Sequence, residues 1–304
     1  MNPAVESRHV TIILNCAAGS AKKGARADRF REIFEEYGIE ARIHELQGGE
    51  GITDLARSAV RNGSFAVVAG GGDGTVNAVA SAVVDSDCAL GILPLGTLNH
   101  FAKDLRIPLD AEKAARTIAT GTIKRVDVGE VNGKIFVNNS GLGLYPSVVR
   151  GREQQQRLGR SKWAALFWGT LAVLRRYPVL LVRLISPDGR KLTRRTPVIF
   201  IGNNQYQMKG LEIGSRTSLD KGTLSVYIVH AGRPVSLIRM TIEALIGRIR
   251  RGRDFDFLEV ENLQIDVARK EIQVATDGEV LTFVPPLMYR IRHLALRVII
   301  PAGE

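Results

Sequence analysis

The sequence has 304 residues, of which 45% are hydrophobic, and carries a formal net charge of +11 at pH 7. Its length exceeds one typical domain and is sufficient for two hydrophobic cores. The two cysteines, Cys16 and Cys88, exclude a disulfide framework, and the N-terminus has no apolar signal region, so we expect a cytoplasmic protein.

The first 123 residues alternate between short apolar runs and segments with helical periodicity. Strands are predicted at 9–15, 41–44, 65–69 and 89–93, and helices at 25–37, 52–61, 76–84 and 111–119. Strands that alternate with helices of this length are typical of a parallel sheet covered on both faces. We therefore predict an α/β domain over residues 1–123, with ligands beyond the carboxyl ends of its strands.

After about residue 123 the pattern changes to short β-rich runs. They lie at 126–131, 135–138, 180–185, 198–202, 223–229, 263–267, 272–276 and 280–284. Three dipeptides typical of hairpin turns occur in this region: Asn132-Gly133, Asp188-Gly189 and Asp277-Gly278. Helical insertions are predicted at 161–176 and 235–247. The pattern predicts a mainly antiparallel β-domain over residues 124–285, after which the chain, from about 286 to 304, returns to the first domain.

A glycine-rich loop follows the predicted strand at 65–69. The loop reads Gly-Gly-Gly-Asp-Gly-Thr over residues 70–75 and leads directly into a helix. Glycines let a ligand approach the backbone, and N–H groups at a helix N-terminus bind anions. Because Asp73 would repel a phosphate held there, we expect a cation between them, which indicates a magnesium nucleotide. The alternative interpretation is an ordinary tight turn between strand and helix.

Four sequence blocks resemble the diacylglycerol kinase catalytic domain family, which includes bacterial lipid kinases and sphingosine kinases. Residues 71–77 match its GGDGTxN signature, residues 94–99 its P-x-G-T-x-N block and residues 277–279 its D-G-E block. Residues 15–19 resemble its N-P-x-x-G nucleotide loop, with Cys16 where proline is usual. The blocks occur in the family's order and span nearly the whole chain.

The resemblance implies a fold and an activity. The fold is that of NAD kinases and diacylglycerol kinases: a nucleotide-binding α/β domain and a β-sandwich domain for the lipid substrate, with a nucleotide cleft between them. The implied activity is ATP- and Mg²⁺-dependent phosphorylation of a hydroxyl of diacylglycerol or a related lipid. The implied nucleotide-binding residues are Asn15, Gly19, Gly71, Gly72, Asp73, Gly74, Thr75, Asn77 and Thr97. Asp73 would also bind the metal, and we expect Asn77 and Asn99 to brace the cleft.

The D-G-E block is implied to supply catalytic carboxylates in addition to Asp73. Glu279 would be the general base, because a lipid alcohol loses its proton only as the new P–O bond forms. Asp277 would orient Glu279 or contact the metal. Without the other blocks, a surface β-turn would be the preferred interpretation of Asp277-Gly278.

Three positions depart from the family's pattern. His100 stands where the family often has aspartate, and it either hydrogen-bonds a phosphate or packs beside Phe101. Lys221 replaces an aspartate that binds a structural magnesium in some bacterial relatives, so we assign no second metal site. Glu45 lies where relatives supply a threonine to the nucleotide. These departures leave open a catalytically silent nucleotide- or lipid-binding protein. An NAD kinase-like soluble kinase is the other alternative, because the GGDG loop at residues 71–74 also resembles that family.

Positive charge is concentrated in two segments. Residues 148–195 contain twelve Arg or Lys and two acids, and residues 248–253 contain four further arginines. No zinc spacing or RNA-binding motif accompanies them, so we predict an anionic membrane surface and no nucleic acid as the partner. A solvated basic face is the alternative interpretation.

An aromatic segment lies inside the first basic region. Trp163, Phe167, Trp168 and Leu171 repeat at helical spacing and form either a core-facing helix or a helix at a membrane interface. The apolar stretch at 163–174 is shorter than the ~20 residues of a membrane-spanning helix. We therefore expect a peripheral protein at the inner membrane face, and the resemblance suggests a homodimer.

Overall fold

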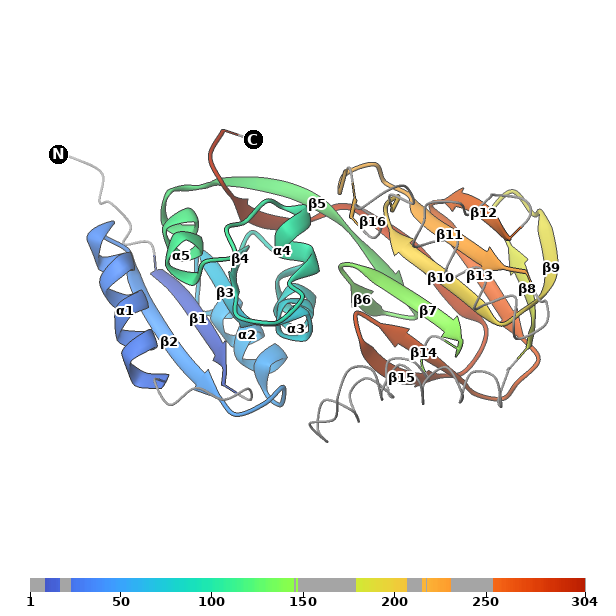
Figure 1. Ribbon diagram of the computed structural model, residues 1–304, viewed down its shortest axis with the longest axis horizontal. Coiled ribbons are helices and arrows are strands. Elements are labelled where there is room, and N and C mark those ends of the chain that lie inside the picture. Colours follow the sequence, from blue (N-terminus) through green and yellow to red (C-terminus); the bar gives the residue numbers. More distant parts are fainter. Residues whose placement is uncertain are drawn as a thin grey trace. The chain divides into compact units, whose positions relative to one another are not determined.

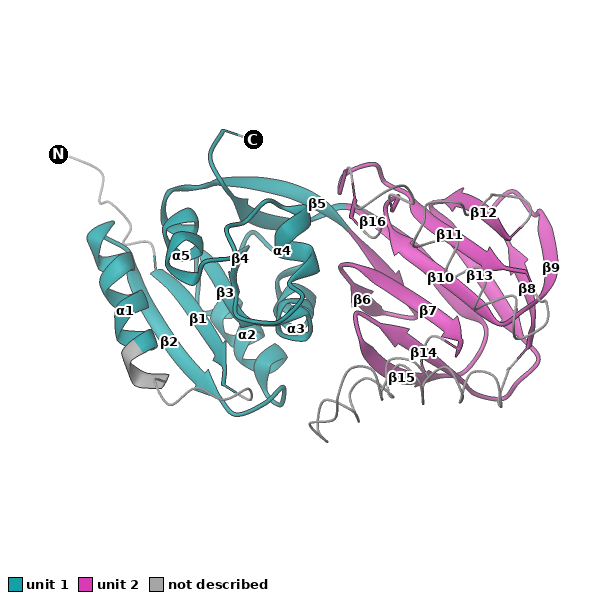
Figure 2. Ribbon diagram, in the orientation of Figure 1, with its two compact units in different colours: residues 1–127, 294–304 teal, residues 128–293 magenta. Residues whose placement is uncertain are grey.

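The computed structural model describes residues 9–16, 23–144, 146, 179–206, 215–216, 218–230 and 254–303. The chain divides into two compact units, residues 1–127 with 294–304 (unit 1) and residues 128–293 (unit 2), which are coloured separately in Figure 2. The helices predicted at 161–176 and 235–247, including the aromatic segment, lie outside the described residues, as do Gly19 and the arginines at 248–253.

A parallel sheet forms the centre of unit 1 (Figure 1). Its strands are β1 (His9–Asn15), β2 (Glu40–Leu46), β3 (Ala66–Gly71) and β4 (Ala89–Pro94), in the order β2-β1-β3-β4. The end of β16 (Leu287–Ile300) continues the sheet beside β4, with Val298 opposite Leu90. Every residue of β3 and β4 is buried because helices cover both faces of the sheet. The predicted parallel α/β architecture is confirmed.

The described residues of unit 1 form four longer helices and one short helix beside this sheet. They are α1 (Lys23–Glu36), α2 (Ile52–Arg61), α3 (Asp73–Val83), α4 (His100–Asp104) and α5 (Ala111–Thr120). Helix α1 packs against α5, and α2 packs against α3. Helix α3 begins three residues earlier than predicted, because Gly72 is its extended N-cap residue and Asp73 lies in its first turn. An acid there interacts favourably with the helix dipole. Helix α4 was not predicted.

Unit 2 is built from two antiparallel layers. One sheet has the order β12-β11-β10-β7-β14-β15. These strands are β7 (Asn139–Gly143), β10 (Val198–Asn203), β11 (Leu224–Val229), β12 (Phe255–Val260), β14 (Ile272–Thr276) and β15 (Glu279–Phe283). The other layer contains β5 (Thr122–Val131), β6 (Lys134–Phe136), β8 (Leu180–Ile185), β9 (Lys191–Thr196), β13 (Asn262–Val267) and the first part of β16. Strands β7, β9 and β12 were missed because glycine, polar or charged residues interrupt their apolar patterns.

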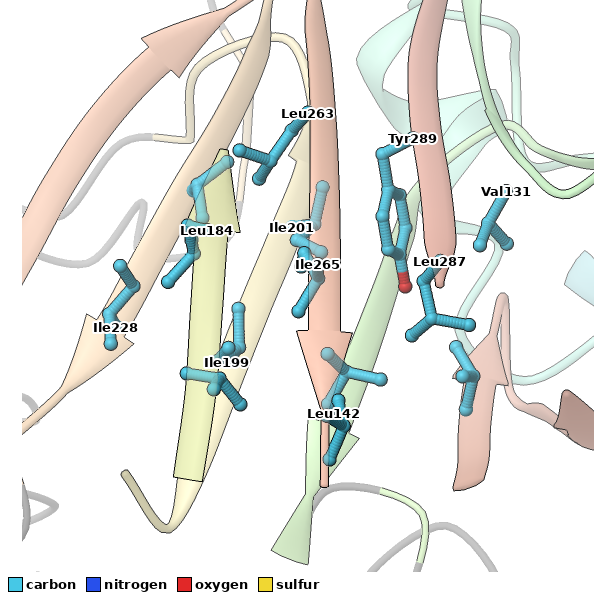
Figure 3. Packing of buried hydrophobic residues seen from close by; sticks show 14 of the residues in the cluster. Val131, Leu142, Leu184, Ile199, Ile201, Ile228, Leu263, Ile265, Leu287 and Tyr289 are labelled. Carbon is cyan, nitrogen blue, oxygen red and sulfur yellow. The ribbon is translucent and has the colours of Figure 1, made fainter. Parts of the chain in front are cut away.

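The core of unit 2 lies between these two layers. Apolar side chains from both layers meet there, among them Leu184 and Ile265 from one and Leu142 and Ile199 from the other (Figure 3). Tyr289 is also in this core, where its hydroxyl lies 3.0 Å from Ser140 Oγ. Burial of one apolar face of each sheet is what makes this arrangement a β-sandwich. The predicted β-sandwich is confirmed.

The hairpin turns predicted in unit 2 are present. Hairpins join β5 to β6, β8 to β9 and β14 to β15. Asn132 and Gly133 have φ values of 44° and 82°, and Asp277 and Gly278 have φ values of 46° and 86°. Positive φ at both central residues defines a type I′ turn, which Asn-Gly and Asp-Gly favour.

Candidate active site

The glycine-rich loops of unit 1 begin at one edge of its sheet. Leu14 of β1 lies opposite Gly70 of β3, and Gly71 lies opposite Pro94 of β4. The carboxyl ends of these three parallel strands are therefore level. The strand order also reverses at β1, whose neighbours are β2 and β3. This is the edge of an open α/β sheet where ligands bind.

The two glycine-rich loops approach each other closely at Gly72 and Gly96. A Cβ added to Gly96 would lie 2.4 Å from the Cα atom of Gly72, and one added to Gly71 would lie 2.4 Å from Thr75 Oγ1. Real Cβ atoms do not make such contacts, so the positions require glycine. The side-chain-free backbone of the loops is a surface on which phosphates can lie close to peptide N–H groups.

Asn99 braces the second loop. It has a left-handed backbone conformation, with φ of 50°. Its Oδ1 accepts the N–H of Gly96 at 3.1 Å, and its Nδ2 donates to the carbonyl groups of Gly96 at 2.9 Å and Pro94 at 3.3 Å. Asn99 therefore braces the loop at residues 94–99, and the role predicted for Asn99 and Asn77 in a nucleotide cleft stays a prediction. Thr97 is exposed in the same loop, and His100 is exposed at the first residue of α4, so His100 is not packed in the core.

The N-terminus of α3 presents both donors and acceptors. The first helical hydrogen bond runs from the N–H of Val76 to the carbonyl of Gly72, so the N–H groups of residues 73–75 precede the helical pattern. Asn15 Nδ2 donates to Thr75 Oγ1 at 3.1 Å, which links the end of β1 to this turn. Such a helix end suits an anion.

Two buried oxygen atoms on α3 have no partner. Asp73 Oδ1 and Asn77 Oδ1 find no hydrogen-bond donor among the described residues. They are four residues apart and therefore lie on one helix face. Buried polar atoms are nearly always satisfied, so this pair offers two oxygen acceptors to a ligand. Carboxylate and amide oxygens suit Mg²⁺, and the neighbouring N–H groups suit phosphate, so these residues fit a magnesium nucleotide.

We expect the Gly96→Ala variant to lose nucleotide binding and stability together. Because the added Cβ would lie 2.4 Å from Gly72 Cα, the two loops must move apart. Overpacking of this kind destabilises a fold by about 1–3 kcal/mol. Urea unfolding and ATP titration calorimetry would measure both effects. The control is Gly49→Ala, since a Cβ at Gly49 has no neighbour within 4 Å; equal behaviour of the two variants would contradict the predicted contact.

The other predicted residues lie in unit 2, on the hairpin of β14 and β15. Asp277 and Gly278 form its turn, and Glu279 is the exposed first residue of β15, opposite Thr276. The Asp277 carboxylate accepts three backbone N–H groups, from Val137 at 2.6 Å, from Asn138 at 2.8 Å and from Asn139 at 3.0 Å. Asp277-Gly278 is therefore a β-turn, as the surface-turn interpretation predicted. The same hairpin carries the D-G-E block on which the resemblance is based.

The surroundings of Asp277 affect its ionisation. Burial raises the pKa of this carboxyl to about 6, while the three backbone N–H groups and the charge of Arg216 act in the opposite direction. Both carboxylate oxygens already accept hydrogen bonds, which favours an orienting role over direct metal contact.

Lys221 and Glu45, the two other departures from the family's pattern, are both exposed. Lys221 is exposed, and its backbone N–H donates to Asn204 Oδ1 at 3.1 Å. Glu45 is exposed on β2, opposite Leu14. Within the described parts of the chain, no group of three or more His, Cys, Asp or Glu side chains could hold a metal ion.

The sequence patterns missed a set of buried polar residues in unit 2. Arg216, Asn138, Asn203 and Asn204 are all buried, and hydrogen bonds connect them. Their positions in the sequence show no spacing that indicates a shared site. A buried arginine resembles any surface arginine in the sequence, so no local signal could have identified the set.

Comparison with known proteins gives consistent similarities. The family model for the diacylglycerol kinase catalytic domain matches residues 9–131, and that for the YegS C-terminal NAD kinase beta sandwich-like domain matches residues 145–300. The chain is 27% identical to the diacylglycerol kinase of Bacillus subtilis (strain 168), covering 95% of this chain and 96% of that protein. It is 31% identical to a probable lipid kinase YegS-like protein of Pseudomonas aeruginosa, covering 82% and 81%.

Two solved structures resemble the fold. A diacylglycerol kinase from Bacillus anthracis aligns with a TM-score of 0.71 and 18% identity, covering 98% of each chain. Yeast NADH kinase in complex with NADH aligns with a TM-score of 0.56 and 11% identity, covering 99% of this chain and 85% of that one.

Proposed function

The chain belongs to the diacylglycerol kinase catalytic domain family, and from this premise we propose that it is an ATP- and Mg²⁺-dependent kinase that phosphorylates a hydroxyl of diacylglycerol or a related lipid. The observation that carries the proposal is the pair of unpartnered buried oxygens, Asp73 Oδ1 and Asn77 Oδ1, beside the two glycine-rich loops. Oxygen acceptors and backbone donors at one helix end match the two parts of a magnesium nucleotide.

The residues of unit 1 would bind and orient the nucleotide. The N–H groups of residues 73–75 would donate to its phosphates, and Thr97 would add a hydroxyl donor. Asn15 holds Thr75 in place through its hydrogen bond. Asp73 would hold the metal, with Asn77 beside it. Bound Mg²⁺ would supply neutralisation of phosphate charge during phosphoryl transfer.

The residues of unit 2 would act on the lipid hydroxyl. Glu279 would accept its proton as the new P–O bond forms. Asp277 would orient Glu279, since its carboxylate fixes the turn from which β15 begins. In this proposal the carboxylate of Asp73 binds the metal, and the carboxylate of Glu279 accepts the proton of the lipid hydroxyl.

An assay with γ-labelled ATP and Mg²⁺ tests the proposal. Diacylglycerol, ceramide, a sphingoid base, phosphatidylglycerol and an isoprenoid alcohol would be offered separately in mixed micelles, with NAD⁺ as a soluble acceptor. The NAD⁺ arm is included because the fold resembles yeast NADH kinase. We expect label in one or more lipids and none in NAD⁺. If NAD⁺ alone is labelled, the acceptor is NAD⁺ and the proposed lipid acceptor is wrong. If the protein binds nucleotide but transfers phosphate to none of these acceptors, the kinase assignment is refuted.

We further propose that the protein associates with the surface of an anionic membrane. No described helix combines the length and the apolarity needed to cross a bilayer. Strands β8 and β9 place Leu181, Arg183, Lys191 and Arg195 on one exposed face, with Asp266 of β13 opposite Arg183. Leu181 is 53% exposed. An apolar side chain among cations suits a surface of anionic headgroups.

We expect charge reversal on this face to weaken vesicle binding. The Lys191→Glu/Arg195→Glu double variant should bind vesicles containing phosphatidylglycerol about 10-fold or more weakly at low salt, because each cation near such a surface contributes about 1 kcal/mol. Co-sedimentation would measure binding. Arg61→Glu/Lys113→Glu, which changes the net charge equally on exposed helices of unit 1, is the control. Equal loss in both variants would indicate a net-charge effect and contradict a surface at β8 and β9.

A further inference from the structure

A buried polar cluster in unit 2 surrounds the backbone of residues 137–139. On one side, the Asp277 carboxylate accepts the N–H groups of Val137, Asn138 and Asn139 at 2.6, 2.8 and 3.0 Å. On the other side, Arg216 donates to the carbonyl of Val137 at 2.7 Å and to Asn138 Oδ1 at 2.9 Å. Residues 137–139 therefore bind the Asp277 carboxylate through their N–H groups and the Arg216 guanidinium through two oxygen acceptors.

The guanidinium group of Arg216 is held on several sides. Arg216 is only 6% exposed. It also donates to the carbonyl of Asn203 at 3.1 Å, and its Cζ atom lies 5.5 Å from the centroid of the Tyr206 ring. The side chain of Asn203 donates to the carbonyl of Val137 at 2.9 Å. Arginine stays charged at all ordinary pH values, so a buried guanidinium needs both acceptors and a counter-charge.

Asp277 is an anion bound to the same backbone segment, and the charge of Arg216 acts on its ionisation. Burial raises the pKa of its carboxyl to about 6, while the backbone N–H groups of residues 137–139 and, to a smaller extent, the charge of Arg216 act to lower it. Loss of the nearby cation would raise this pKa further and so favour the protonated carboxyl. A protonated carboxyl accepts hydrogen bonds less strongly, so the N–H groups of residues 137–139 would be held less firmly.

We propose that Arg216 is a positioning residue that holds the Asp277-Gly278 turn, and through it Glu279, in the geometry required by the reaction. The proposal rests on the proposed lipid kinase function for the role of Glu279. The connection is short: Arg216 fixes residues 137–139, these fix the carboxylate of Asp277, and Glu279 begins β15 two residues later. Arg216 itself contacts neither substrate nor reacting atoms in this proposal.

Amide hydrogen exchange and carboxyl NMR titration test the structural part. In Arg216→Met we expect at least 10-fold faster exchange at residues 137–139 and 276–279, and a raised pKa of Asp277. Arg216→Lys keeps the charge without the planar fork, so its changes should be smaller. The turn at Asn132-Gly133 belongs to a different hairpin of unit 2 and should not change. Arg290→Met, which removes a bidentate pair with Glu130, is the matched control.

The pH dependence of lipid phosphorylation tests the link to Glu279. We expect Arg216→Met to lower kcat at least 10-fold at pH 7, with an unchanged KM for ATP, and to move the acid limb of the rate profile to higher pH. Arg216→Lys should recover part of kcat. If Arg216→Met does not fold, Arg216→Lys takes its place. Its amide exchange, its Asp277 titration and its pH–rate profile then test whether Arg216 positions the turn.

Two results would overturn the proposal. One is a folded Arg216→Met whose Asp277 titration and exchange at 276–279 match the wild type, because Arg216 would then only support overall stability. The other is a shifted titration with an unchanged rate profile, because Glu279 would then be positioned independently. If the wild type phosphorylates no lipid, the proposed function fails and with it the role of Glu279. Exchange and titration would still show whether Arg216 holds the turn.

Discussion

The Asp73→Asn variant is expected to retain the fold and lose lipid kinase activity. The amide is nearly isosteric with the carboxylate but lacks its charge, so it holds Mg²⁺ poorly beside phosphates. Oδ1 of Asp73 is buried and has no hydrogen-bond partner among the described residues, so the change removes no hydrogen bond to this atom there. We expect kcat to fall about 100- to 1,000-fold, as for loss of one group that stabilises transition-state charge. Initial rates across a Mg²⁺ titration would measure it.

A matched control separates this effect from a general effect on helices. Asp54 lies in the first turn of α2, as Asp73 does in α3, and its side chain is 85% exposed. Asp54→Asn should alter stability by a few tenths of a kcal/mol at most, because exposed charges near a helix end have small effects. An active Asp73→Asn protein with wild-type Mg²⁺ dependence would exclude Asp73 as the metal ligand.

The second large effect is expected for Glu279→Gln. Glutamine keeps the shape of the side chain but cannot accept a proton, so kcat should fall about 100- to 10,000-fold. Nucleotide binding should be unchanged, because the residues that we assign to the nucleotide belong to unit 1. Single-turnover rates with a lipid acceptor and calorimetric titration with ATP would measure the two quantities separately.

The control for Glu279 is Glu271→Gln. Glu271 is exposed and directly precedes β14, the partner strand of β15, so its change tests the loss of one surface carboxylate near the same hairpin. We expect wild-type rates for it. A Glu279→Gln protein that transfers phosphate at the wild-type rate would remove Glu279 from the mechanism, while leaving the nucleotide site of unit 1 intact.

Much of unit 1 was predicted from its sequence, because the signals there are local. Apolar runs located β1, β3 and β4, and helical periodicity placed α2 at Ile52–Arg61. The level carboxyl ends of the strands follow from parallel pairing, so the loops at residues 70–75 and 94–99 were expected at one edge. The preference of Asp-Gly for a type I′ turn likewise predicted the hairpin that carries Glu279.

Contacts between distant segments were decided only by the tertiary structure. Position 96 requires glycine because Gly72 lies against it, and the orphaned oxygens of Asp73 and Asn77 become evident only once burial is known. Residues 137–139 bind both Arg216 and Asp277, so these hydrogen bonds join three segments far apart in the chain. Spacing and propensity report neighbours along the sequence. Burial and hydrogen bonding depend on which surfaces the folded chain brings together, and they determine which charges remain in the interior of unit 2.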